Sequence, residues 1–152
     1  MSIVDVMNVR LVSVTPEARV EEAIQAMLDR GVGSVAVCEG PRLVGILTER
    51  DVLRLAGRGA RMDELAVRHV MRTRLVTVSP DDGILSVARL MREHDVRHLP
   101  VVDGEHVLGM VGSREVLDAL AERMWRSHDE VAHETVHQLL ERRAPDADQA
   151  RA

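Results

Sequence analysis

The chain has 152 residues with 20 basic and 25 acidic side chains, so its formal net charge is −5 when histidine is neutral. Hydrophobic residues make up 45% of the sequence, which is enough to bury a core. The acidic balance and the presence of one Trp without Phe or Tyr argue against nucleic acid as a partner. No apolar run is long enough to span a bilayer and the N-terminus lacks a signal-peptide pattern, so we expect no membrane contact and a cytoplasmic location.

The chain contains an internal repeat. When the sequence is shifted by 64 residues, residues 6–53 align with residues 70–117 without a gap, and the identities include Pro16, Gly45 and Leu53. Two units of about 48 residues are too small to be very stable alone. We therefore expect each repeat to bury its apolar face against the other.

Hydrophobic spacing predicts the elements of repeat one. Residues 11–15 alternate with period two and end at Pro16, which predicts a strand followed by a turn. Apolar residues then recur at helical spacing from Val20 to Leu28, and Gly31 ends that helix. The second strand, the turn, the third strand and a helix capped by Thr48 are predicted at residues 34–38, 39–41, 43–47 and 49–55.

Repeat two shows the same order of patterns. Its strands are predicted at residues 75–79, 99–102 and 107–111, and its helices at residues 84–93 and from about Ser113. The fold class is therefore α+β, with two βαββα repeats and an added C-terminal helix. The predicted parts are repeat one at 1–56, a linker at 57–69, repeat two at 70–120, a C-terminal helix at 121–143 and a disordered tail at 144–152.

Three features of the sequence stand out: an M-x-x-x-x-V-(S/T)-V start in both repeats, RLVGILTERDVL in repeat one and VRHLPVVDGEHVLGMV in repeat two. Together they resemble the CBS-domain pair, named after cystathionine β-synthase, over about residues 3–120. The resemblance implies a non-catalytic regulatory module whose two repeats pack about a pseudo-two-fold axis. It also implies clefts for adenosine-containing ligands, namely AMP, ADP, ATP or S-adenosylmethionine, with no further cofactor. A homodimer and a regulated protein partner are expected by the same resemblance.

The resemblance assigns ligand contacts to the start of the second helix of repeat one. A carboxylate at this position can accept both vicinal hydroxyls of a ribose, and this role falls to Asp51. Thr48 lies where the free N–H groups of a helix N-terminus can meet a phosphate. The alternative is that Thr48 only caps the helix and that Asp51 is only a solvated acid of its first turn.

The second copy departs from this motif. Gly112 stands in the position of the threonine, Glu115 replaces the aspartate and the hydroxyl moves to Ser113, so we expect a weaker or empty cleft there. By resemblance, Arg97 and His98 cross over to the phosphates that the repeat-one motif holds. The alternative is that these two are exposed polar residues at a strand start.

Recognition of adenine is expected from the backbone of the first strand of each repeat. The residues concerned are Leu11 and Val12 in repeat one and Leu75 and Val76 in repeat two. Because the chain lacks Phe and Tyr, the base would lie between aliphatic side chains, which are expected in any core.

The C-terminal helix carries a competing motif, since His133 to His137 matches the H-E-x-x-H pattern of zinc metalloproteases. Leu140 and Arg143 stand where a metzincin would have its glycine and third histidine, so we expect neither catalysis nor a resident metal. We expect instead a surface or interface helix whose apolar stripe, which includes Trp125 and Val136, packs on a partner. A structural adaptor without nucleotide and a small zinc hydrolase remain the alternative functions.

Overall fold

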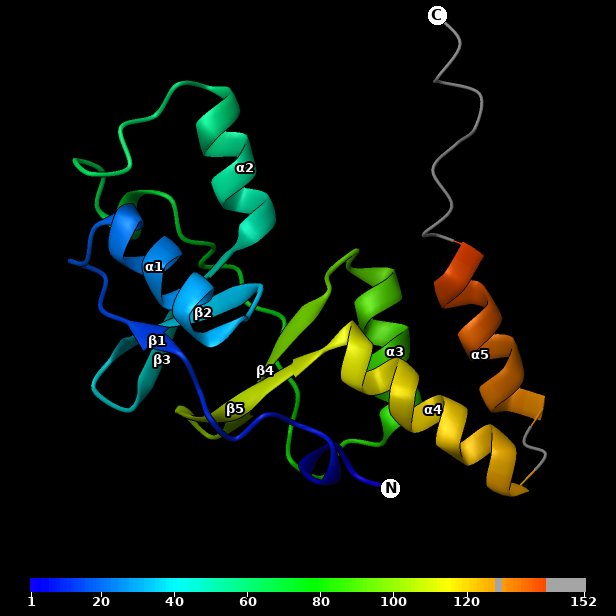
Figure 1. The fold of residues 1–152 in the computed structure, drawn as a ribbon. Helices are drawn as coiled ribbons and strands as arrows, with labels where there is room; N and C mark the ends of the chain where they lie inside the picture. Colours follow the sequence, from blue (N-terminus) through cyan, green and yellow to red (C-terminus); the bar gives the residue numbers. More distant parts are fainter. Residues whose placement is uncertain (128–129, 142–152) are drawn as a thin grey trace, which may run out of the picture. The chain divides into compact units, whose positions relative to one another are not determined.

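The computed structural model describes residues 1–127 and 130–141 (Figure 1). The elements of repeat one are β1 (Ser13–Val14), α1 (Val20–Arg30), β2 (Ser34–Glu39), β3 (Arg42–Thr48) and α2 (Glu49–Gly57). Those of repeat two are α3 (Ile84–Glu93), β4 (His98–Asp103), β5 (His106–Gly112) and α4 (Ser113–Ser127), followed by α5 (Glu130–Glu141). Short 3₁₀ helices, η1 (Ile3–Asp5) and η2 (Val67–His69), lie just before the aligned segments 6–53 and 70–117. The predicted α+β class is confirmed.

The turns between paired strands repeat as the sequence does. Gly40 joins β2 to β3 with φ +59°, and Gly104 joins β4 to β5 with φ +60°. This left-handed conformation favours glycine because a Cβ would be strained there. The glycines at these equivalent positions therefore set the two hairpins.

The first strand of repeat two was predicted from the sequence but does not form in the structure. No strand forms at residues 75–79; only Val78 makes an isolated parallel bridge, to Val101. In repeat one, the N–H of Ala36 donates to the carbonyl of Val12 over 2.9 Å and extends the ladder between β1 and β2. The residue equivalent to Ala36 is Pro100, which has no N–H to donate. The ladder in repeat two is therefore shorter.

The chain divides into two compact units that do not coincide with the repeats. One unit comprises residues 8–79 and 100–110 and the other comprises residues 1–7, 80–99 and 111 onward, so that the chain crosses between them within β4 and β5. The sheet has the strand order β1-β2-β3-β5-β4, with β1 parallel to β2 and the β2–β3 and β3–β5 pairs antiparallel. In the first unit, a core forms from residues of α1, β2, β3 and η2: Val20, Ala23, Met27, Val35, Val37, Leu47 and Val67.

The division arises because the leading segments of the two repeats are exchanged. Val67, at the start of η2, donates its N–H to the carbonyl of Ala18 in repeat one over 2.8 Å. At the equivalent positions 64 residues away, the N–H of Ile3 donates to the carbonyl of Asp82 in repeat two over 2.9 Å. Ile3 and Val67 are both fully buried. Each repeat is thus completed by the segment that leads into the other.

A second pair of bridges continues the exchange. Arg72, just before repeat two's first strand, exchanges backbone hydrogen bonds of 2.9 and 3.1 Å with Ile46 in β3. The equivalent residue Asn8 exchanges bonds of 2.8 and 3.1 Å with Met110 in β5. The first residues of each repeat are therefore attached to the last strand of the other repeat.

In the second unit, α4 packs against α3 and against α5 (Figure 1). The side chain of Arg92 in α3 also donates to Gln138 in α5. The residues assigned to one C-terminal helix, 121–143, are distributed in the described chain between the second half of α4 and α5. The predicted tail at 144–152 lies outside the described residues. Within the part of the chain that the structure describes, no helix has the length and apolar character needed to cross a membrane.

The exchange of leading segments predicts a large effect of a substitution close to the N-terminus. Ile3→Ala removes a fully buried side chain and is expected to lower the free energy of unfolding by about 2–5 kcal/mol. The neighbouring Val4 is 46% exposed, and Val4→Ala is expected to change stability by less than about 0.5 kcal/mol. Urea unfolding of both variants measures the difference; equal stabilities would contradict a structural role of this segment.

Candidate functional site

Thr48 and Asp51 form a reciprocal cap at the start of α2. The Oγ1 atom of Thr48 accepts from the backbone N–H of Asp51 over 3.3 Å, and Oδ2 of Asp51 accepts from the backbone N–H of Thr48 over 3.1 Å. The hydroxyl of Thr48 also donates to Oδ2 of Asp51 over 2.9 Å. The predicted cap is confirmed, and it orients the carboxylate.

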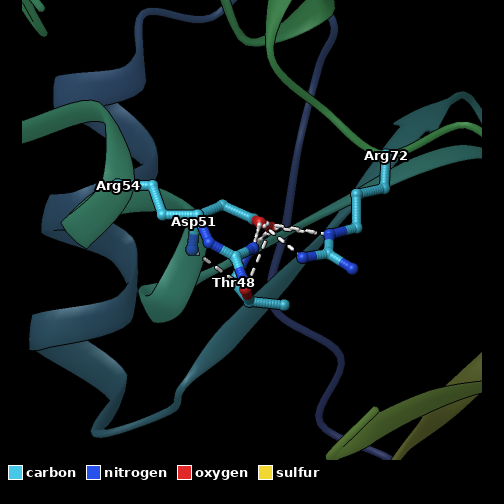
Figure 2. A network of polar contacts seen from close by, with 4 residues as sticks. All are labelled: Thr48, Asp51, Arg54 and Arg72. Carbon is cyan, nitrogen blue, oxygen red and sulfur yellow. Dashed lines mark hydrogen bonds and ion pairs between the residues drawn. The ribbon is translucent and has the colours of Figure 1, made fainter. Parts of the chain in front are cut away.

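Arg72 completes this arrangement from a distant part of the sequence. Its Nη2 and Nε atoms donate to Oδ1 of Asp51 over 2.8 and 3.1 Å, which makes a forked contact (Figure 2). Arg54, one turn after Asp51 on α2, brings its Nη1 atom to 3.6 Å from the same oxygen. The carboxylate therefore lies between the threonine of its own helix and the guanidinium of Arg72.

The carboxylate of Asp51 is held in its charged form. Its side chain is 11% exposed. Burial alone would raise the pKa of Asp51, but the hydrogen bonds from Arg72 and Thr48 and the charge of Arg72 together hold this pKa below its usual value. The site thus combines a shielded anion with a partly exposed cation.

The equivalent motif of repeat two is capped by a different pair. The N–H of Gly112 donates to Oε2 of Glu115 over 2.9 Å. A Cβ on residue 112 would lie 2.5 Å from Oε2 of Glu115, so glycine leaves room for the longer acid to fold back. The position equivalent to Arg72 is held by Asn8, whose Oδ1 accepts from the backbone N–H of Arg10 over 2.9 Å. This motif therefore carries an acid without an arginine at that position.

Arg97, His98, Ser113 and Glu115 belong to one unit, and the backbone joins two of them. The N–H of Ser113 donates to the carbonyl of Arg97 over 2.8 Å, and a Cβ on Gly112 would lie 3.5 Å from Cδ2 of His98. Arg97 is exposed and His98 is half-buried. Their assignment to the phosphates of the repeat-one motif remains a prediction.

The four residues predicted to meet adenine are half-buried. The carbonyl of Val12 accepts from Ala36 within the β1–β2 ladder, and its side chain packs on the core of the first unit. Leu11 lies beside it, and Leu75 and Val76 lie in the segment that does not form a strand. The adenine contact also remains a prediction.

Sequence reasoning missed Arg54 and Arg72. Arg54 follows Asp51 by three residues on a helix, and this spacing alone would have placed it near the carboxylate. No local pattern marks Arg72, because it reaches Asp51 only through the bridge to Ile46. Knowledge of the segment exchange would have been required to find it.

The H-E-x-x-H match lies on α5, where His133 and His137 are exposed. Among the described residues, no group of three or more His, Cys, Asp or Glu side chains is arranged to hold a metal ion. The side chain of Glu134 accepts from Gln138, which also contacts α3. This part of α5 therefore serves helix packing.

Comparisons with known proteins agree with the duplicated fold. The family model for the CBS domain matches residues 3–58 and 67–122, so the chain belongs to the CBS-domain family. The CBS domain-containing protein YhcV of Bacillus subtilis is 32% identical over 139 residues, which are 90% of this chain and 99% of YhcV. Inosine-5'-monophosphate dehydrogenase of Korarchaeum cryptofilum is 33% identical over 70% of this chain, but that region is only 21% of the enzyme. CBS pairs therefore also occur as parts of enzymes.

Solved structures share the fold. A protein with CBS domains from Burkholderia ambifaria superposes with a TM-score of 0.70 at 29% identity, covering 74% of this chain and 83% of that chain. The CBS-domain pair of protein MJ0100, solved in complex with 5'-methylthioadenosine and S-adenosyl-L-methionine, superposes with a TM-score of 0.74 at 19% identity, covering 81% of this chain and 98% of that chain. The tandem CBS pair is thus established as the architecture of this chain.

The contacts of Asp51 predict how its ionisation responds to mutation and acid. Arg72→Ala removes the contacts that outweigh burial, so the pKa of Asp51 should rise. In the wild type this pKa is depressed, so the stability that the carboxylate contributes is present above the unfolded-state pKa of about 3.9 and is lost as the pH falls through the folded-state pKa. NMR titration of the Asp51 carboxyl carbon measures this pKa in the wild type and in Arg72→Ala, with Arg68→Ala as control. An unchanged midpoint in Arg72→Ala would contradict this account.

Proposed function

We propose that the protein is a non-catalytic sensor that binds an adenosine-containing ligand at the Thr48–Asp51 motif of repeat one. The observation that carries this proposal is the carboxylate of Asp51, shielded to 11% exposure and oriented by Thr48 at the start of a helix. A carboxylate fixed in this way can accept the two vicinal hydroxyls of a ribose, and the N–H groups of the helix start favour a phosphate. The MJ0100 complex supports the proposal, since the same fold holds adenosine compounds there.

The arginines beside Asp51 favour an anionic nucleotide as the ligand of this motif. Arg54 and Arg72 both lie beside Asp51, and guanidinium groups pair well with phosphates. We further propose that Arg97 and His98 add phosphate contacts. The motif of Gly112 and Glu115 lacks the threonine hydroxyl and has Asn8 in place of Arg72, so it is proposed to bind more weakly or not at all.

The proposed output is a shift in association with a second copy of the chain or with a regulated protein. Large apolar side chains that remain exposed in the described chain support such contacts: Trp125 is 85% exposed on α4, Leu53 73% on α2 and Leu28 70% on α1. A ligand that binds the associated state more tightly than the free state would shift this equilibrium. A structural adaptor that binds no nucleotide is the competing function.

A ligand panel tests the sensor against the adaptor. AMP, ADP, ATP and S-adenosylmethionine are each added to the purified chain, and thermal unfolding is recorded. A ligand present at about 100 times its Kd should stabilise the chain by about 2.7 kcal/mol through binding linkage. If none of them shifts the unfolding temperature at millimolar concentration, the sensor proposal is rejected and the adaptor is favoured.

The asymmetry of the two motifs provides a matched pair of variants. Asp51→Ala removes the proposed ribose contact and should weaken AMP binding by about ten- to a hundredfold, because bonds to charged groups contribute roughly 1.5–3 kcal/mol. Glu115→Ala changes the equivalent acid of repeat two and should leave affinity nearly unchanged. Calorimetric titration measures both; a larger loss for Glu115→Ala, or two equal sites per chain, would place the ligand at the other motif.

A further inference from the structure

The acceptor positions of Asp51 are already filled. Oδ2 accepts two bonds from Thr48, of 3.1 and 2.9 Å, and Oδ1 accepts two bonds from Arg72, of 2.8 and 3.1 Å. The Nε–H of Arg72 is also shared with Oδ2, over 3.3 Å. A carboxylate offers about four lone-pair sites in all. Two ribose hydroxyls can therefore bind Asp51 only by replacing donors that occupy it in this structure.

Arg72 is the donor that can leave. The bonds from Thr48 form the cap of α2, and residues only three apart in sequence make them. The side chain of Arg72 is 43% exposed, so its guanidinium can move into water, whereas its backbone stays fixed by the two bonds to Ile46. Displacement of Arg72 therefore leaves both the helix cap and the strand pairing intact.

We propose that Arg72 is a specificity-determining residue that competes with the ribose for Asp51. This inference rests on the proposed function and goes beyond it by naming the ligand class. A neutral nucleoside that displaces Arg72 breaks an ion pair and returns nothing to the guanidinium. A ligand with a phosphate offers a new anion that arginine can bind in a forked geometry. Arg72 thus selects anionic adenosine nucleotides over neutral nucleosides.

The internal repeat supports a role for Arg72 beyond folding. Asn8 occupies the equivalent position and makes the same backbone bridge, to Met110. The fold therefore accepts a neutral side chain where the bridge is made. The arginine serves the motif that carries Asp51.

The test is calorimetric titration of adenosine and AMP into the wild type, Arg72→Ala and Arg72→Gln. Arg72→Gln keeps most of the side-chain length and serves if Arg72→Ala is unstable. Arg68→Ala is the matched control, because Arg68 is a partly exposed arginine of the same unit that pairs with Glu17. Removal of the competitor should strengthen adenosine binding by about tenfold or more. The gain for AMP should be smaller, so that the preference for AMP over adenosine falls, and Arg68→Ala should behave as the wild type.

The outcomes separate this proposal from the proposed function. If adenosine binds the two Arg72 variants but not the wild type or Arg68→Ala, the result supports both the Arg72 proposal and the proposed function. If AMP binds the wild type but neither Arg72 variant gains affinity for adenosine, Arg72 does not compete and only this proposal is overturned. If neither ligand binds any of the four proteins, there is no ribose for Arg72 to exclude and both proposals fail.

Discussion

The exchange of leading segments between the two repeats is the constraint on which the rest of the structure depends. Val67 lies just before repeat two but bonds to Ala18 of repeat one, and Ile3 lies at the start of repeat one but bonds to Asp82 of repeat two. Both side chains are fully buried. A single repeat cut out of the sequence would lose the segment that covers it, so burial of the apolar surface requires the tandem pair. The compact units consequently cut across the repeats.

The same exchange builds the candidate site from both repeats. Thr48 and Asp51 belong to repeat one, whereas Arg72 enters from the segment leading into repeat two and is fixed by its bridge to Ile46. The anion and its cation are therefore 21 residues apart in sequence and meet only when the pair is folded. Any change that loosens this segment also changes the charge balance at Asp51.

Local sequence patterns predicted most of the fold and, of the candidate site, Thr48 and Asp51. α3 was predicted with its observed bounds and Thr48 as the cap of α2, because helix periods and caps are decided by residues a few positions apart. The strand expected at residues 75–79 failed because its ladder depends on Pro100, which lies in a different strand and cannot donate a hydrogen bond. Arg72 was missed for the same physical reason, since its neighbour is set by pairing between distant segments.

The divergence of the two copies shows which residues at the start of α2 and α4 the fold itself requires. Both helix starts are capped, one by Thr48 with Asp51 and the other by Glu115 folding back over Gly112. Capping therefore does not require the threonine, the shorter acid or the arginine. Because either pair satisfies the helix, the fold alone does not explain why Thr48, Asp51 and Arg72 occur together in one copy while Gly112, Glu115 and Asn8 occur in the other. The proposed nucleotide, which would need a shielded carboxylate, a hydroxyl and a cation within one motif, would account for this difference.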